Sequence, residues 1–285
     1  MAGVRDIKRR IRSVKSTQQI TKAMKMVSAA KLRRTQAATV SSRPYTNKLG
    51  EILERIVASA GETKHPLMLE RPLKSVGIIL ISADRGLAGG YNANVLKKGI
   101  LEAVRFGETE VAFIAVGRKG RDFLRRRNKK IDGQIMGIKD VPTFNEAQQI
   151  AQLAVDSFLA NKYDAVYMIY QEFVSPVQQH PVMKQLLPLP YEEAEKEEAM
   201  EYLYEPGPQE VLEILLPKYI NNTVYHILME TKASEHGARM AAMGSATDNA
   251  SEMIDKLTLS YNRSRQAAIT REISEIVGGA NALQG

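Results

Sequence analysis

The chain has 285 residues, enough for one full hydrophobic core with additional structure or for two modest domains. Hydrophobic residues make up 44% and charged residues 25%, and no apolar run approaches the roughly 18 residues that a membrane-spanning helix needs. The sequence contains no cysteine, which excludes a disulfide scaffold and any metal site with thiolate ligands. Its formal charge of +8 favours an acidic partner.

The basic charge is assigned to the N-terminal segment. Residues 1–43 contain 12 Lys or Arg and one acid, Asp6, so they carry +11 and the rest of the chain sums to −3. Such a composition is also typical of a mitochondrial transit peptide. The charge alone leaves three interpretations open, namely an acidic protein partner, a nucleic acid and a solvated helix face. Against nucleic acid, the segment has no aromatic residue on which bases could stack.

Both ends of the chain are predicted to be long helices. All 11 prolines lie between Pro44 and Pro217, and a proline inside a helix costs about 3 kcal/mol or more. Apolar residues recur at helical spacing near the start of the chain and again from residue 220 onward. Between 238 and 250 this stripe consists of small residues and methionine, which let two helix axes approach closely. Because a domain must turn the chain between them, we predict an antiparallel coiled coil of these helices.

The middle of the chain alternates strands with helices. Three short, continuous apolar runs indicate strands that are buried on both faces, and they lie at 76–81, 111–116 and 165–170. Helix-like stretches are interspersed with them, at 92–105, 118–127 and 143–161. This alternation predicts a doubly wound, Rossmann-like parallel sheet, so the fold class is α/β with a coiled coil added.

The segment before the last helix reads differently. Residues 173–189 contain three prolines and are predicted to form an irregular hairpin that leaves the sheet. Residues 191–213 follow with nine Glu and one Lys, a local charge of −8. The expected domains are an N-terminal coiled-coil helix (1–60), a central α/β domain (74–205) and a C-terminal coiled-coil helix (209–285).

The motifs that could carry chemistry are weak. Gly86, Gly89 and Gly90 follow the first strand, but the sequence around them fits neither G-x-G-x-x-G nor the P-loop pattern. The four histidines form no metal-ligand pattern, and Asp84 with Arg85 is more typical of a cap on the next helix than of a catalytic pair. We therefore expect no catalytic residue, no cofactor and no metal. A nucleic-acid-binding coiled-coil protein with a basic arm and a small α/β enzyme remain the alternatives.

The two ends of the chain carry a family resemblance. Residues 20–34 read ITKAMKMVSAAKLRR and residues 261–282 read YNRSRQAAITREISEIVGGANA. Both segments resemble the terminal signatures of the ATP synthase γ subunit, and SADRGLAGGYN (82–92), EYLYEP (201–206) and ATDNA (246–250) resemble internal family segments. Ala88 stands where many members have cysteine. Because the signature includes residues 20–34, the N-terminal segment is interpreted as mature protein, and a chain that begins at Met1 favours a bacterial origin.

The resemblance implies the central shaft of a rotary ATP synthase. In this family the terminal helices enter a ring of three α and three β subunits, and the α/β domain binds the ε subunit and the c ring near the membrane. The shaft is expected to be non-catalytic and peripheral at the cytoplasmic face of the bacterial membrane, with no membrane span and no bound nucleic acid. By position, the residues implied in subunit contacts are Met24, Lys25, Arg85, Ala88, Tyr204, Glu205, Arg265, Gln266, Thr270 and Glu272. Ala88 is expected to lie in an exposed turn, 85–90, that approaches the acidic tip of β.

Overall fold

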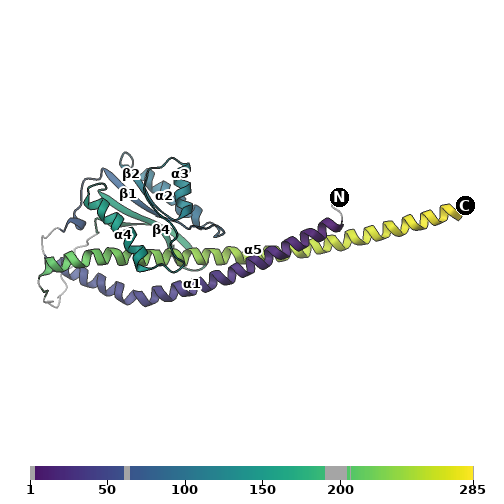
Figure 1. The fold of residues 1–285 in the computed structure, drawn as a ribbon, viewed down its shortest axis with the longest axis horizontal. Coiled ribbons are helices and arrows are strands. Elements are labelled where there is room, and N and C mark those ends of the chain that lie inside the picture. Colours follow the sequence, from purple (N-terminus) through teal and green to yellow (C-terminus); the bar gives the residue numbers. More distant parts are fainter. Residues whose placement is uncertain (1–3, 61–64, 190–203, 206, 285) are drawn as a thin grey trace. The chain divides into compact units, whose positions relative to one another are not determined.

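A computed structural model describes residues 4–60, 65–189, 204–205 and 207–284 (Figure 1). In chain order the elements are α1 (Val4–Ala60), η1 (Pro66–Met68), β1 (Ser75–Ile81), α2 (Tyr91–Arg105), β2 (Glu110–Val116), α3 (Arg118–Arg126), β3 (Ile131–Ile135), α4 (Phe144–Leu159), β4 (Ala165–Phe173), β5 (Gln179–Leu187) and α5 (Pro208–Gln284). The chain divides into two compact units, one made of residues 1–27 with 240–285 and the other of residues 28–239. Each unit contains part of both long helices, so the division into 1–60, 74–205 and 209–285 stays a prediction.

The end helices are longer than their proline-free segments. Helix α1 has 57 residues and continues past Pro44, and α5 has 77 residues and includes Pro217. Each proline removes one helical N–H donor, but both are exposed, so water can solvate the carbonyl group that loses its partner. The proline-free segments therefore indicate where both helices lie, although neither helix ends at its proline.

In the first unit α1 and α5 pair in antiparallel directions. Gln18 Nε2 donates to Ser251 Oγ at 2.6 Å, and Thr247 Oγ1 donates to Thr21 Oγ1 at 2.8 Å. A later residue of α1 therefore lies opposite an earlier residue of α5. The predicted antiparallel pairing is confirmed. Its seam contains small side chains as expected, but hydroxyl and amide groups also bond across it, which the apolar pattern did not indicate.

The sheet has the strand order β3-β2-β1-β4-β5. Strand β1 pairs in parallel with β2 and β4, β2 pairs in parallel with β3, and β5 is antiparallel to β4. The doubly wound sheet is therefore confirmed. Residues 173–189 do turn the chain back as a hairpin, but the prediction that they leave the sheet is wrong. Residues 179–187 form the edge strand β5, which pairs with β4 with one irregularity in register. Pro181 is tolerated there, since an edge strand has only one neighbour to bond.

Layers of helices cover both faces of the sheet (Figure 1). On one face Ile78 and Leu80 of β1 pack in a cluster with residues of α2 and α3, such as Val95 and Leu124. On the other face Ile79 belongs to the larger cluster, which includes residues of α1, α4 and α5. Because successive side chains of β1 point to opposite faces of the sheet, this strand contributes to both cores. Burying α5 on the second face joins the α/β domain to the C-terminal helix.

Gly117 forms the tight turn between β2 and α3. Its φ of +93° is unfavourable for any other residue, and a Cβ atom there would lie 2.1 Å from the carbonyl oxygen of Ser82. We expect Gly117→Ala to lower the free energy of unfolding by about 3 kcal/mol, because backbone strain and a backbone clash add together. Urea unfolding followed by tyrosine fluorescence measures this in the right unit, since every tyrosine except Tyr261 lies in residues 28–239.

Gly107 provides the matched control for this substitution. Its φ is +60°, but a Cβ atom there would meet nothing within 4 Å. Gly107→Ala should therefore cost only the strain, about 1 kcal/mol. Equal losses in the two variants would show that the close contact with Ser82 contributes nothing.

Candidate functional site

The crevice at the carboxyl ends of β1 and β4, where the strand order of this sheet reverses, is where doubly wound folds bind their ligands. In this chain α5 occupies it. Tyr91 Oη donates to the carbonyl oxygen of Thr231 at 3.3 Å, and Ser234 Oγ donates to the carbonyl oxygen of Gln171 on β4 at 2.9 Å. The remaining cavity, lined partly by Thr231 and Lys232, has a volume of about 10 Å³. That volume suits at most one water molecule, so a nucleotide does not fit there.

Asp84, the acidic member of the weak catalytic pair, is engaged with the backbone. Its carboxylate accepts the N–H of Arg118 at 2.9 Å and the N–H of Gly137 at 3.0 Å. It therefore caps α3 and fixes the segment after β3, whereas Arg85 is exposed. The prediction of a capping role is confirmed, but the helix is α3 and not α2, the next helix in the chain.

The glycine-rich turn after β1 is held against α5. The guanidinium of Arg239 donates to the carbonyl oxygen of Gly86 from Nε and Nη2, both at 3.4 Å. Leu87 has a φ of +60° and is 63% exposed, whereas Ala88 is 2% exposed and packs in a small cluster with Ala238. The turn at 85–90 is largely exposed, as expected, but it directs the side chain of Ala88 inward. Leu87, like Arg85, projects into solvent from this turn.

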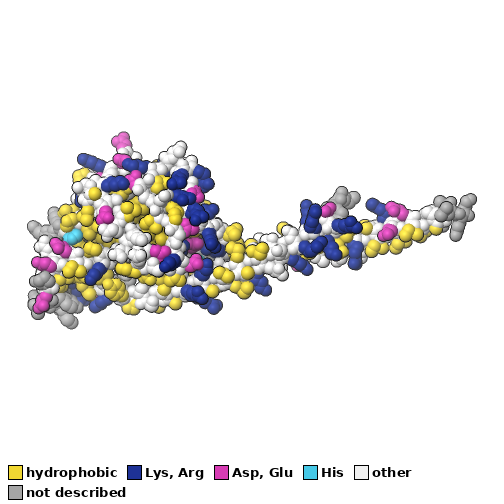
Figure 2. Space-filling view, viewed as in Figure 1, with side chains coloured by type: hydrophobic (Ala, Val, Ile, Leu, Met, Phe, Trp, Pro, Cys, Tyr) yellow, Lys and Arg dark blue, Asp and Glu magenta, His cyan; other side chains and the backbone are white. Residues whose placement is uncertain are grey.

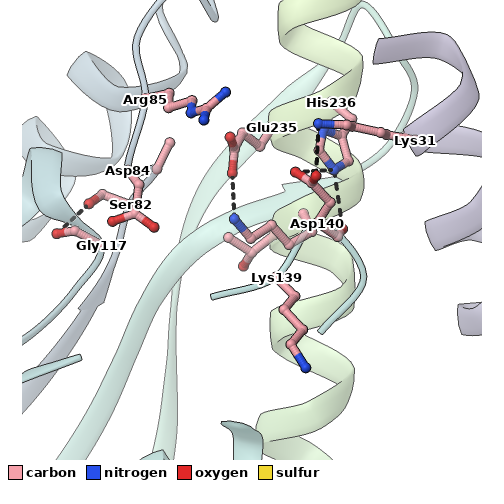
Figure 3. Close-up of polar contacts among 12 residues, drawn as sticks. Lys31, Ser82, Asp84, Arg85, Gly117, Lys139, Asp140, Glu235 and His236 are labelled. Carbon is pink, nitrogen blue, oxygen red and sulfur yellow. Dashed lines mark hydrogen bonds and ion pairs between the residues drawn. The ribbon is translucent and has the colours of Figure 1, made fainter. Parts of the chain in front are cut away.

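A buried ionic cluster lies on α5 beside this turn (Figure 3). Glu235 is 3.0 Å from the Lys232 ammonium and 2.8 Å from the Arg239 guanidinium, and all three side chains are nearly inaccessible to solvent. Burial opposes ionisation of Glu235, but the attraction of the two cations is stronger and lowers the pKa of its carboxyl. The cluster is therefore ionised inside the protein, and its charges fix α5 against the domain.

Asp140, between β3 and α4, contacts both long helices (Figure 3). Its carboxylate lies 2.7 Å from the Lys31 ammonium on α1. Its carbonyl oxygen accepts from Thr35 Oγ1 at 3.3 Å and lies 3.2 Å from Nε2 of His236 on α5. His236 is completely buried, and burial lowers the pKa of its imidazole, so it is neutral and donates from Nε2. We name these four residues the Asp140 clamp.

The clamp should show energetic coupling between Lys31 and Asp140. We expect a double-mutant cycle with Lys31→Ala and Asp140→Ala to give a coupling energy of about 1 kcal/mol. This value is at the upper end of the coupling energies of half-exposed ion pairs. The cycle is measured by urea unfolding with tyrosine fluorescence. The matched control is the pair Lys130 and Glu110, which is equally short at 2.6 Å but more exposed. A coupling no larger than that of the control would mean that the clamp is an ordinary surface ion pair.

The residues implied in subunit contacts lie in both compact units. In the first unit Met24 is partly buried and five others are exposed, namely Lys25, Arg265, Gln266, Thr270 and Glu272. In the second unit Arg85 and Glu205 are exposed, and Tyr204 packs against the main core. The structure thus leaves most of these side chains free for contacts with other chains and does not gather them into one catalytic site.

The sequence gives no indication of the Asp140 clamp. Lys31 and Thr35 precede Asp140 by about a hundred residues, and His236 follows it by about as many. No motif links these positions, although Lys31 belongs to the segment 20–34. Periodicity placed His236 on an ordinary helix, and no local signal indicates that it is buried. Within the described ranges no group of three or more His, Asp or Glu residues could hold a metal ion. The helices of these same ranges include none that is long and apolar enough to cross a membrane.

Comparison with known proteins gives the same family along the whole chain. A family model described as ATP synthase matches residues 3–283. A protein of Moorella thermoacetica named ATP synthase gamma chain is 51% identical over 284 residues, covering 100% of both chains. The gamma chain of Heliobacterium modesticaldum is 50% identical over 291 residues, covering 99% of this chain and 100% of the relative.

Solved structures show the same fold. The central stalk and c ring of the Tetrahymena thermophila mitochondrial ATP synthase contains a chain with a TM-score of 0.63 and 25% identity, covering 80% of this chain and 99% of that one. A chain of the Euglena gracilis mitochondrial enzyme has a TM-score of 0.68 and covers 98% of this chain and 94% of that one; at 17% identity it supports the fold alone. With its sequence relatives, its fold and a ligand crevice occupied by its own helix, the chain belongs to the ATP synthase gamma-chain family.

Proposed function

We propose that this chain is the central shaft subunit of a rotary ATP synthase. It couples ion-driven rotation of the membrane c ring to conformational cycling of the catalytic β subunits. Physically, each angle of an asymmetric shaft stabilises one conformation of a given β subunit over the others, so rotation shifts the three sites through their states in turn. The family membership and the likeness to a mitochondrial central stalk support this proposal.

The main structural support for this proposal is the exposed C-terminal stretch of α5. All residues from 265 to 280 are exposed, although four large apolar side chains recur there at helical spacing: Ile269, Ile273, Ile276 and Val277. Their exposed fractions run from 47% to 65%. An apolar stripe of this kind is expected to be covered by a partner. A ring of three α and three β subunits that encloses the end of α5 supplies that cover.

The remaining contact residues divide between the ring and the base. Met24, Lys25 and the turn at Arg85 are proposed to face the acidic tip of β, and Arg265 with Gln266 an acidic loop of β. Thr270 and Glu272 belong to the same stretch inside the ring. Tyr204 and Glu205 are proposed to face ε and the c ring. In this division residues 1–60 and 209–285 form the shaft and residues 74–205 the base.

We also propose that the subunit is non-catalytic and peripheral, at the cytoplasmic face of a bacterial membrane. The occupied crevice supports the first part, because α5 takes the place that a nucleotide would need. Catalysis then belongs to the β subunits, and this chain contributes only differential contacts. No cofactor or metal is required for such a role.

Reconstitution tests the proposal. The chain is mixed with α and β subunits, and magnesium-dependent ATP hydrolysis is measured in the purified complex and in the isolated chain. We expect a stable complex with restored multi-site hydrolysis and an isolated chain without activity. A chain that forms no complex with α and β, or that hydrolyses ATP alone, would contradict the proposal.

Arg265 should contribute to coupling. A guanidinium that meets carboxylates at a partly desolvated interface contributes about 1–3 kcal/mol. We therefore expect Arg265→Ala to lower the turnover or the coupled ATP synthesis of the assembled enzyme roughly 5-fold to 150-fold. The exposed position of Arg265 means that folding of the subunit, followed by circular dichroism, should not change. Unchanged ATP synthesis in Arg265→Ala with Gln266→Ala would show that this contact does not matter.

A further inference from the structure

A second concentration of basic residues lies on α3 and the turn that follows it. Residues 118–130 contain eight Lys or Arg and one acid, Asp122, a local charge of +7. The basic charge is therefore not confined to the N-terminal segment. Acidic residues elsewhere cancel the charge of 118–130 when the net charge of residues 44–285 is added up. The structure shows that the segment forms one surface of the α/β domain.

Few of these cations are neutralised within the chain. Arg121 pairs with Asp122 at 2.7 Å and Lys130 pairs with Glu110 at 2.6 Å. Six others are exposed and make no ion pair with any residue that the structure describes: Arg118, Lys119, Arg125, Arg126, Arg127 and Lys129. Figure 2 shows dark-blue side chains gathered over the part of the domain that contains α3. This surface therefore presents positive charge that is not compensated by acidic side chains of the described residues.

The basic surface borders a groove. Arg125 and residues 128–134 line an open space of about 640 Å³ between the end of α3 and β3. The one carboxylate in the lining, Asp132, lies 3.0 Å from the Lys162 ammonium and accepts a hydrogen bond from Tyr163 Oη at 2.6 Å. Its charge is thus already compensated from within the domain, and the groove presents net positive charge.

Strand β3 gives the groove a second property. It is the last strand of the sheet and pairs only with β2, so one row of its main-chain N–H and C=O groups faces away from the sheet. An extended peptide can bind such an edge by adding one more strand, with main-chain hydrogen bonds for affinity and side-chain contacts for specificity. Charged side chains commonly keep such an edge from pairing with other chains. The cations in the lining of this groove, Arg125, Lys129 and Lys130, would instead attract an acidic segment.

We propose that the groove along β3 binds an acidic, extended segment of a partner protein, which adds to the sheet as a sixth strand. Its glutamate and aspartate side chains meet Arg125, Arg126 and Lys129. A concave groove beside a free strand edge favours a peptide over a flat layer of anionic lipid headgroups, which cannot reach the main-chain groups. The site goes beyond the shaft contacts proposed above and does not depend on them.

Fluorescence anisotropy tests this with the full chain and a short, labelled peptide of alternating glutamate and valine. The groove variant is Arg125→Glu with Arg126→Glu and Lys129→Glu. The control variant makes the same charge change on α1, with Arg5→Glu, Lys8→Glu and Arg12→Glu, all exposed positions. At about 150 mM salt, where long-range charge effects are screened, we expect the groove variant to weaken binding roughly tenfold or more and the control roughly threefold at most.

Two further arms separate strand addition from simple attraction of charge. A peptide with the same charge but with proline in place of valine loses every second N–H donor and has φ fixed near about −65° at those residues, so it should bind at least about fivefold more weakly. Equal binding of the two peptides, or equal losses in the groove and control variants, would overturn the proposal. Phosphatidylserine vesicles that bind with the same dependence on the groove, while the peptide does not bind, would assign the surface to a membrane and also overturn it.

Discussion

Replacing Glu235 by alanine is expected to lower the free energy of unfolding of the 28–239 unit by about 3–5 kcal/mol. The carboxylate is the only acid between Lys232 and Arg239 in this buried cluster, at 3.0 and 2.8 Å from their charged groups. Its removal leaves two desolvated cations without a counter-charge, which costs far more than the loss of one exposed ion pair. Urea unfolding followed by tyrosine fluorescence gives the difference.

The control for Glu235→Ala removes the charges together. A triple variant with methionine at 232, 235 and 239 has no uncompensated charge and keeps much of the packing, so it should recover most of the lost stability. If the triple variant is as unstable as Glu235→Ala, the loss comes from packing and not from the buried cations. If Glu235→Ala costs less than about 1 kcal/mol, the cluster is solvated in the folded protein.

The pH dependence of this effect has a definite sign. Burial opposes ionisation of Glu235, but the neighbouring cations lower its pKa below the ordinary value of 4.5. A group with a lowered pKa in the folded state stabilises the protein fully above its unfolded pKa and loses that contribution as pH falls through the folded pKa. The difference between wild type and Glu235→Ala should therefore be constant near neutrality and shrink below about pH 4.5.

The sequence predicts the parts of this fold whose signals are local. Strands β1, β2 and β4 were found because both of their faces are buried, which makes each a continuous apolar run. Strand β3 reads IDGQI, and its polar residues hide it at the edge of the sheet. Strand β5 was expected to leave the sheet because Pro181 is acceptable only at an edge, and edge position is a property of the assembled sheet.

Only those features of the candidate site that depend on local sequence could be predicted. The absence of a phosphate loop follows from the sequence, whereas the occupation of the crevice by α5 depends on residues far apart in the chain. The Asp140 clamp and the burial of Ala88 depend likewise on packing against residues of α5 that lie far away in the sequence, His236 for Asp140 and Ala238 for Ala88. The exposure of Arg265 and its neighbours follows from the helical pattern. The N-terminal helix has no further apolar stripe against which this part of α5 could pack.

A cross-link between shaft and ring tests whether this chain rotates inside its ring. The chain contains no cysteine, so a single engineered thiol is unique. Leu87 is the position to use, because it is 63% exposed in the turn after β1, whereas Ala88 is 2% exposed. A cysteine at 87 and another on the acidic tip of β should form a disulfide under mild oxidation if the two surfaces approach each other.

One such bond between shaft and ring should abolish nearly all multi-site ATP hydrolysis, although no catalytic residue has been changed. Reduction should restore it, and Leu87→Cys without the cysteine on β should stay active under oxidation. With separately labelled β subunits, reduction, turnover and re-oxidation should leave the chain bonded to any of the three. A cross-linked enzyme with full multi-site activity, or a chain that always re-forms its bond with the first β, would contradict rotation.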